Sequence, residues 1–269
     1  MMLPIRKKKI NEFTSFLASE YTDGKKTLLE DILDSEDLLC HADHYEDYFD
    51  GMLTYNQRDF NIHINIDRGN QLAFKRGRFT LGHELAHYFL DEHRIGLKYG
   101  FLESHGSKHE LNQKDPIELE ADYFAACLLM PQDKMKGLDH KMKFSLQKIL
   151  AVSDYFQASV LASALRYIEL CVHELMIVVS KNNTVLWYAQ NEQFPKWPFR
   201  FKVGGKLPPT TVAGEFFTKL DSKYSTVEEV NPDDWFYPFV NDGRANRKMN
   251  EQCYYSDSYG YVISLLWFK

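Results

Sequence analysis

Residues 79–90 read Phe-Thr-Leu-Gly-His-Glu-Leu-Ala-His-Tyr-Phe-Leu and contain the pattern His-Glu-x-x-His at residues 83–87. The apolar residues of this stretch recur at a spacing that predicts a helix with one face in a core. His83 and His87 are four residues apart, so both imidazoles lie on one helical face and can bind one metal ion. Glu84 is then directed at a bound water and is the candidate general base of catalysis.

A catalytic zinc ion needs a third protein ligand beside its open water position. The best source is a second predicted helix at residues 116–130, with Asp115 as its N-cap candidate. Glu118 shares an inward face with Asp122 and two small alanines, which would let this helix pack closely on the first one. Two alternatives stay open: Glu118 serves only in a capping box with Asp115, or Glu120 is the ligand instead.

Other histidines compete for the ligand role. His93 lies six residues after His87, the spacing of the third ligand in metzincins, but Leu90 stands where that pattern has a glycine. His105 and His109 belong to a polar segment that we interpret as a solvated loop. The candidates for stabilising the oxyanion are Tyr88, His93, Arg78 and Tyr123. The candidate carboxylates for orienting an imidazole are Asp122 and Asp91.

Two blocks, Phe-Thr-Leu-Gly-His-Glu-Leu-Ala-His-Tyr at 79–88 and Glu-x-Glu-Ala-Asp-x-Phe-Ala-Ala-x-Leu-Leu-Met-Pro at 118–131, resemble the ImmA/IrrE family of metallopeptidases. The resemblance implies a zincin-like peptidase fold and a zinc ion held by His83, His87 and the glutamate of the second block. It also implies a substrate class, namely helix-turn-helix repressors that are cut once to switch on a stress response or a mobile element. Composition and spacing do not indicate that substrate.

The composition is that of a globular chain, with 269 residues, 44% hydrophobic and 26% charged. The net charge of −6 argues against generic binding of nucleic acid, which needs a basic face. Four scattered cysteines suit the reducing cytoplasm, and no apolar run is long enough to span a membrane. We therefore expect a cytoplasmic enzyme that contains zinc, acts on a protein substrate and binds neither DNA nor a membrane directly.

The expected fold class is α+β, in three parts. Residues 1–143 would form the zinc metallopeptidase domain, with helices near Ile5–Tyr21 and Thr27–Leu39. Residues 60–66 alternate as a strand that could pair with Met52–Asn56 and form a sheet edge for the substrate. Residues 92–114 are expected to be a polar loop between the two ligand helices.

The second part, residues 144–170, resembles a helix-turn-helix with Ser159 as an N-cap. Its only basic residues are Lys148 and Arg166, so we favour packing or protein docking over DNA binding.

The third part, residues 171–269, is expected to be a small α+β domain for sensing or docking. The resemblance to the IrrE branch, where the corresponding region resembles a GAF-like sensor, implies a regulatory role. The domain should contain a hairpin turning at Asn182–Asn183, a helix near Val212–Leu220 and a closing strand, Tyr259–Trp267. Its many aromatic residues favour a core over a ligand pocket.

A rival interpretation is a non-catalytic regulator that binds a repressor or toxin partner and holds zinc only for structure. Structural zinc sites are closed by four protein ligands, whereas a catalytic site keeps one position open for water. The coordination of the metal therefore separates the two functions.

Overall fold

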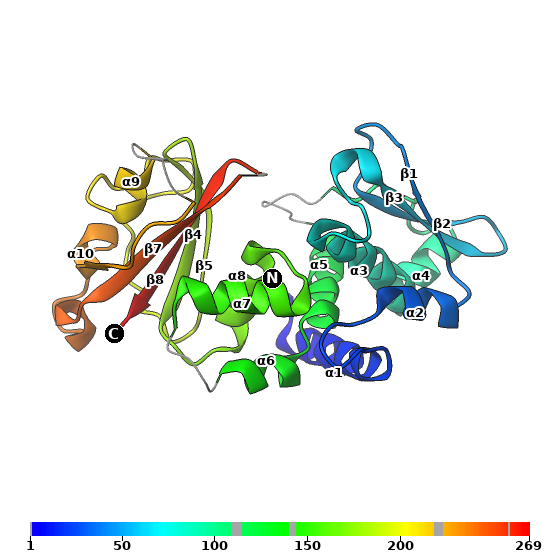
Figure 1. Cartoon of the computed structure of the whole chain (residues 1–269), viewed down its shortest axis with the longest axis horizontal. Helices are drawn as coiled ribbons and strands as arrows, with labels where there is room; N and C mark the ends of the chain where they lie inside the picture. Colours follow the sequence, from blue (N-terminus) through cyan, green and yellow to red (C-terminus); the bar gives the residue numbers. More distant parts are fainter. Residues whose placement is uncertain (1, 109–114, 140–143, 218–222, 258) are drawn as a thin grey trace. The chain divides into compact units, whose positions relative to one another are not determined.

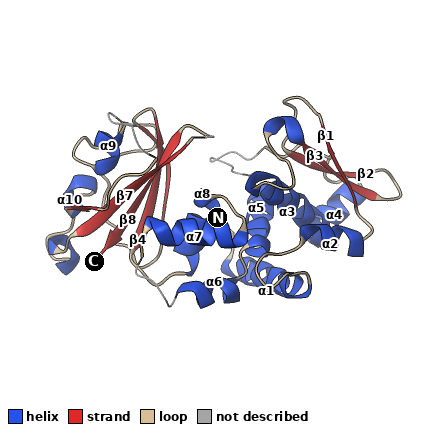
Figure 2. Ribbon diagram, in the orientation of Figure 1, coloured by secondary structure: helices blue, strands red, loops and turns tan. Residues whose placement is uncertain are grey.

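The computed structural model describes residues 2–108, 115–139, 144–217, 223–257 and 259–269. The fold is α+β, as expected, and Figures 1 and 2 show its helices and strands. The chain divides into two compact units, Met1–His140 with Leu150–Arg166, and Lys141–Ile149 with Tyr167–Lys269. The three-part division of the sequence stays a prediction.

The first unit begins with a helical layer. Its helices are α1 (Pro4–Glu20), α2 (Leu29–Ser35), α3 (Lys75–Phe89), α4 (Asp91–Lys98), α5 (Pro116–Leu129) and α6 (Gln132–Asp139). The two predicted ligand helices, α3 and α5, form as expected. The expectation of a loop throughout residues 92–114 is wrong, because α4 occupies its start. The second helix is also shorter than predicted, since Leu39 already belongs to a strand.

A three-stranded sheet accompanies these helices in the order β1-β3-β2, from β1 (Leu39–Asp43), β2 (Gly51–Tyr55) and β3 (Phe60–Asn65). β2 and β3 are antiparallel with Leu53 opposite Ile62, which confirms the predicted pairing. β1 pairs with β3 in parallel. A 3-10 turn, η1 (Ile66–Arg68), then leads toward α3.

The two ligand helices approach each other closely. A Cβ atom added at Gly82 of α3 would lie 3.4 Å from the Cβ of Ala125 in α5. Leu81, Leu85 and Phe124 are buried around this crossing. The small residues predicted on the inward face of α5 thus allow the contact that brings the candidate ligands together.

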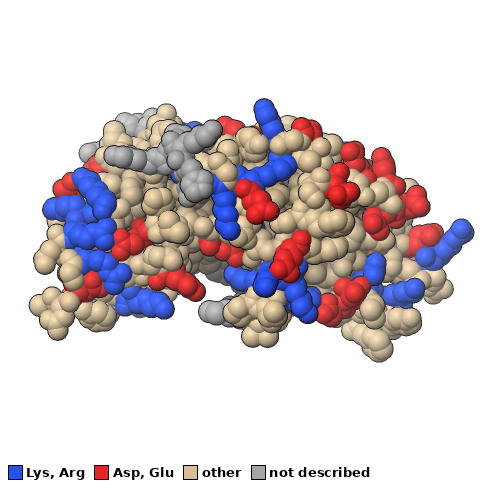
Figure 3. Space-filling model, turned by 90° about the horizontal axis from the view of Figure 1, so that it is seen from below, with Lys and Arg blue, Asp and Glu red and all other residues tan. Residues whose placement is uncertain are grey.

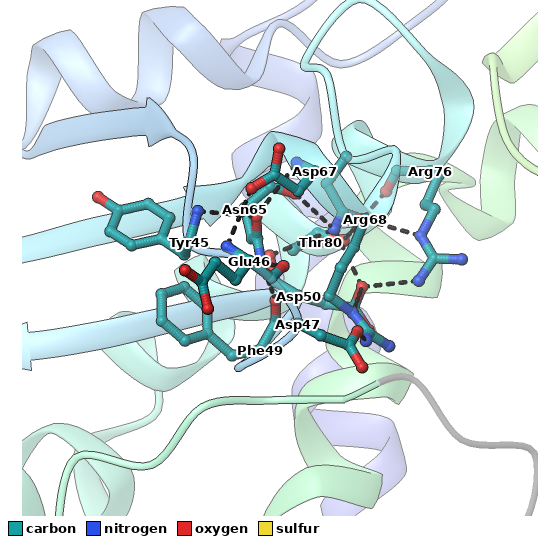
Figure 4. A network of polar contacts seen from close by, with 11 residues as sticks. Tyr45, Glu46, Asp47, Phe49, Asp50, Asn65, Asp67, Arg68, Arg76 and Thr80 are labelled. Atoms are coloured by element: carbon teal, nitrogen blue, oxygen red, sulfur yellow. Dashed lines mark hydrogen bonds and ion pairs between the residues drawn. The ribbon is translucent and has the colours of Figure 1, made fainter.

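The polar network in Figure 4 fixes the first residues of β2. The buried carboxylate of Asp50 accepts hydrogen bonds from Arg68 Nε at 3.0 Å and Arg76 Nη2 at 2.6 Å. The Asn65 amide donates to the carbonyl oxygens of Glu46 and Phe49, both at 2.8 Å. These contacts hold the chain just before Gly51, which proves important for the site.

The helix pair α7 (Leu146–Phe156) and α8 (Val160–Leu170) is joined at Gln157, whose φ is +53°. Ser159 Oγ accepts from the backbone N–H of Ala162 at 3.1 Å, which confirms it as the cap. Lys148 and Arg166 are both buried, so neither side chain is exposed to bind phosphate. On the face drawn in Figure 3, acidic and basic side chains are interspersed.

The second unit contains a five-stranded antiparallel sheet in the order β5-β4-β8-β7-β6. Its strands are β4 (Leu175–Lys181), β5 (Thr184–Gln190), β6 (Glu228–Val230), β7 (Met249–Ser256) and β8 (Tyr261–Phe268). The turn between β4 and β5 has Asn182 and Asn183 at positive φ, as the predicted hairpin requires.

Short helices α9 (Val212–Phe216) and α10 (Pro232–Trp235) and the 3-10 turn η2 (Gly243–Asn246) complete the second unit. The helix predicted near Val212–Leu220 begins as expected, but residues 218–222 lie outside the described residues. The aromatic residues Phe194, Trp197, Phe201, Trp235, Phe236 and Phe268 pack into one hydrophobic core. These aromatic side chains thus pack in a core, which is the role that the sequence analysis favoured over a ligand pocket.

Candidate metal centre

Helix α3 buries the whole His-Glu-x-x-His pattern. His83, Glu84 and His87 are 1%, 0% and 4% exposed. Burial of three ionisable side chains on one helix is costly unless they share strong partners. The partners come from α5, which lies directly beside α3.

Glu118 of α5 faces both histidines. Its Oε2 is 3.2 Å from His83 Nε2, and its Oε1 is 3.3 Å from His87 Nε2. The two imidazole Nε2 atoms are 3.1 Å apart. One ligand atom from each of the three residues lies within 4.8 Å of the others. Two imidazoles and a carboxylate are a donor set that zinc uses in catalytic sites, so these residues fit a metal ion.

The structure places the rival carboxylate elsewhere. Glu120 Oε2 accepts hydrogen bonds from Arg6 at 2.6 and 3.0 Å and does not join the cluster found among the described residues. Asp115 accepts from the N–H of Ile117 at 2.9 Å and so caps α5, as expected. Glu118 is thereby left to reach the histidines.

Each of the three clustered residues has its own outer partner. His83 Nδ1 is 2.9 Å from Asp122 Oδ1, the carboxylate predicted for this purpose. His87 Nδ1 is 3.1 Å from His93 Nδ1, and Glu118 Oε1 is 2.7 Å from His105 Nε2. Such partners fix the tautomer and orientation of metal ligands.

Two residues were judged wrongly from the sequence. Asp91 is 2.8 Å from Arg94 in an exposed ion pair and does not orient an imidazole. His105, interpreted as part of a solvated loop, instead reaches Glu118. His109, the other histidine of that segment, lies outside the described residues.

Backbone pairing explains how His105 reaches the site. The Asp50 N–H donates to the Ser107 carbonyl at 2.7 Å, and the Ser107 N–H donates to the Gly51 carbonyl at 2.8 Å. Ser107 therefore adds to the start of β2. A Cβ atom at Gly106 would lie 2.4 Å from the Cβ of Phe49, so this close approach requires glycine. Gly106 was the one local signal that the segment is held against the domain.

The histidines and glutamate influence each other's protonation. Burial lowers the pKa of His83, but the hydrogen bonds that its imidazole donates to the carboxylates of Asp122 and Glu118 outweigh burial and raise the pKa to about 10. Burial holds the pKa of His87 below its usual value. Burial would raise the pKa of Glu118, but His105, His83 and His87 lower it below its usual range. The metal-free centre thus contains a carboxylate that attracts a cation.

A small cavity of about 10 Å³ adjoins the cluster, which is room for one water molecule. Its lining residues are Leu53, Glu84, His87, His93, Leu97, Leu102, His105 and Ile117. Glu84 and His105 thus border the same water-sized space beside the candidate ligands.

The residues considered for stabilising an oxyanion are engaged with other groups. The Tyr88 hydroxyl donates to Glu36 at 3.1 Å, and Arg78 donates to the Thr27 carbonyl at 2.8 Å. The Tyr123 hydroxyl accepts from Asn11 at 2.8 Å. His93 Nδ1 is 3.1 Å from His87 Nδ1, although His93 also lines the cavity. His105, which was not on that list, borders the cavity directly.

The comparisons with known proteins match a segment of the chain that contains these residues. Residues 61–167 match the family model of the peptidase M78 family, described as an IrrE N-terminal-like domain. The resemblance to the ImmA/IrrE family carried by residues 79–88 and 118–131 is therefore confirmed. No curated protein matches the chain.

A solved structure that matches is a Mycobacterium tuberculosis transcriptional regulator, at 12% sequence identity and a TM-score of 0.61. The match covers 97% of this chain and 76% of that chain. At this identity the likeness shows a shared fold. Among the described residues, no helix is long and apolar enough to cross a membrane.

Proposed function

We propose that this chain is a zinc-dependent endopeptidase of the cytoplasm that cleaves a helix-turn-helix repressor. The observation that carries the proposal is the buried cluster of His83, His87 and Glu118 beside the cavity that Glu84 borders. The family match supports a peptidase, and the regulator among the similar folds supports a role in transcription control. The repressor as substrate rests on the family resemblance.

His83, His87 and Glu118 would hold the zinc ion, which when bound supplies Lewis acidity toward water and the scissile carbonyl. Glu84 would take a proton from a water molecule as the water oxygen bonds to the scissile carbonyl carbon, and would pass that proton to the amine nitrogen as the C–N bond breaks. Asp122, His93 and His105 hold the ligand side chains in place while this transfer occurs. The part of the edge strand β2 that follows Gly51, where Ser107 pairs, can accept an extended substrate segment as a further strand.

The test separates metal binding from proton transfer. Glu84→Gln should bind one zinc ion per chain by elemental analysis, because Glu84 is not a ligand, and should cleave nothing. Cleavage is measured by mass spectrometry of a proteome-derived peptide library and of helix-turn-helix repressors from the same genome. A Glu84→Gln protein that cuts at the wild-type rate would rule out Glu84 as the base.

The identity of the third ligand has its own comparison. Glu118→Ala should lose zinc, whereas Glu120→Gln should retain full stoichiometry at saturating metal. The opposite pattern would make Glu120 the ligand.

One observation favours the non-catalytic alternative enough to test it. His105 Nε2 is 2.7 Å from Glu118 Oε1, so a small shift would make it a fourth protein ligand. X-ray absorption of the zinc-loaded protein distinguishes the two states. Two imidazoles, one carboxylate and one water oxygen support the peptidase, and three imidazoles support a closed structural site.

A further inference from the structure

A row of polar side chains leads from His87 to the N-terminal helix. His87 Nδ1 lies 3.1 Å from His93 Nδ1. His93 Nε2 lies 3.5 Å from Glu120 Oε2. The same Glu120 oxygen accepts from Arg6 Nη2 at 2.6 Å and Arg6 Nε at 3.0 Å. We call His93, Glu120 and Arg6 the outer relay.

The proton positions along this row are determined once a metal binds. A neutral imidazole that offers Nε2 to a metal carries its proton on Nδ1. His87 Nδ1–H must therefore donate to His93 Nδ1, which leaves the His93 proton on Nε2. This nitrogen is 3.5 Å from the Glu120 carboxylate, whose charge Arg6 balances. The protons along the row therefore face one way, from His87 to His93 and from His93 toward Glu120.

Burial gives these contacts strength. His93 is 2% exposed, and the side chains of Glu120 and Arg6 are 21% and 23% exposed. Hydrogen bonds to charged groups are stronger away from solvent. The three residues come from α4, α5 and α1, so they also connect three helices, and a purely structural role is the competing explanation.

We propose that the outer relay is a positioning device that fixes the tautomer and orientation of His87 and so sets how tightly the metal is held. The proposal rests on the metal centre of the proposed function. Arg6 lies before the matched residues 61–167, so the relay would make the N-terminal helix a part of the centre. It also gives Glu120 a defined role, other than that of a ligand.

The test measures the zinc dissociation constant of the full chain by competition with a chromogenic chelator. His93→Leu removes the acceptor for His87, and Glu120→Leu removes the acceptor for His93. Each should weaken zinc binding by about 10- to 100-fold, the range found for outer partners of metal ligands. Arg6→Met, a change near the surface and one step further from His87, should weaken zinc binding less than either of these substitutions.

Two control variants distinguish a positioning role of the outer relay from a purely structural one. Glu92→Gln alters the exposed partner of Arg6, 3.0 Å away, and should change zinc affinity less than twofold. His93→Gln restores an acceptor oxygen and should recover part of the affinity lost in His93→Leu. The visible spectrum of the cobalt-substituted protein should shift in His93→Leu and return toward wild type in His93→Gln.

The outcomes are distinct. Unchanged zinc affinity in His93→Leu, Glu120→Leu and Arg6→Met would overturn the relay while leaving the metal centre intact. Lower melting temperatures with unchanged affinity and unchanged cobalt spectra would show a structural role only, which also overturns it. A wild-type chain that binds no zinc would overturn both the relay and the proposed function.

Discussion

Glu84 lies directly against the backbone of the edge strand. A Cβ atom at Gly51 would lie 2.6 Å from Glu84 Oε1 and 2.7 Å from Thr80 Cγ2. Gly51→Ala should therefore displace the Glu84 carboxylate, lower cleavage by about 10-fold or more, and destabilise the fold by about 1–3 kcal/mol. Zinc stoichiometry should stay at the wild-type value. Library cleavage and urea unfolding measure the two effects.

The matched control is Gly137→Ala, because a Cβ atom at that position in α6 meets nothing within 4 Å. It should leave cleavage unchanged and stability equal or slightly higher. Wild-type cleavage by Gly51→Ala would show that Glu84 does not need its observed position.

Glu251 predicts how the stability of the C-terminal unit depends on pH. Burial raises the pKa of Glu251 to about 7, although Trp235, Ala213 and Val212 donate hydrogen bonds to it. Between pH 4.5 and 7 the folded state keeps a proton that the unfolded state has released. The contribution of Glu251 to stability is therefore fully present below about pH 4.5 and is lost as pH rises through 7.

The C-terminal unit should accordingly be about 2–3 kcal/mol less stable at pH 8 than at pH 5 because of this group. Denaturant unfolding followed by tryptophan fluorescence checks it, since the Trp235 indole donates to Glu251 at 2.8 Å. Glu251→Gln has no proton to lose and should remove this part of the pH dependence. An equal pH dependence in both proteins would contradict the assignment to Glu251.

Among the elements, the pairing of Ser107 with β2 is what brings His105 to Glu118. Ser107→Pro removes the N–H that donates to Gly51 and should release this segment. We expect faster hydrogen exchange at the Asp50 amide and slower cleavage, with zinc still bound by its three ligands.

Ser107→Ala is the control, because it keeps the backbone N–H and removes a buried hydroxyl that has no hydrogen-bond partner among the described residues. It should resemble wild type in exchange and in cleavage. Equal effects of the two substitutions would show that backbone pairing is not what holds His105.

Helices with strong local signals could be predicted from the sequence. The periodicity of residues 79–90 and the capping pair Asp115 and Pro116 predicted α3 and α5, and hence the cluster of His83, His87 and Glu118. The β2–β3 hairpin followed from alternation. In each case the interaction that forms the element lies within a few residues along the chain.

The parts that were missed depend on distant contacts. α4 buries only His93 and Gly96, so its polar sequence resembled a loop. His105 is held through residues 51 and 107, which are far apart in sequence, and no local pattern encodes that pairing. Leu39 was assigned to a helix, but parallel pairing with Asn61 makes it a strand.

For the whole molecule, the division into two units falls within helices α7 and α8, since residues 150–166 group with the first unit. The three clustered residues His83, His87 and Glu118 all precede residue 119. A fragment ending near Leu170 is therefore expected to bind one zinc ion, while losing regulated cleavage of its target. The regulatory part follows from the proposed sensing or docking role of residues 171–269.

Elemental analysis of the fragment tests the prediction that it binds zinc, and circular dichroism verifies that the fragment is folded. Loss of zinc from a folded fragment would show that the second unit contributes to the centre. Cleavage with an unchanged rate and unchanged dependence on the inducing signal would show that residues 171–269 have no part in control.

The position of Arg6 has a practical consequence for anyone purifying this protein. Leu3 and Arg6 line a cavity of about 720 Å³ together with His93 and Glu120. An affinity tag fused before Met1, or trimming by contaminating proteases, would act next to groups that contact a candidate zinc ligand. By the proposed relay, preparations that differ in their first residues are expected to differ in zinc content, and a tag after Lys269 provides the comparison.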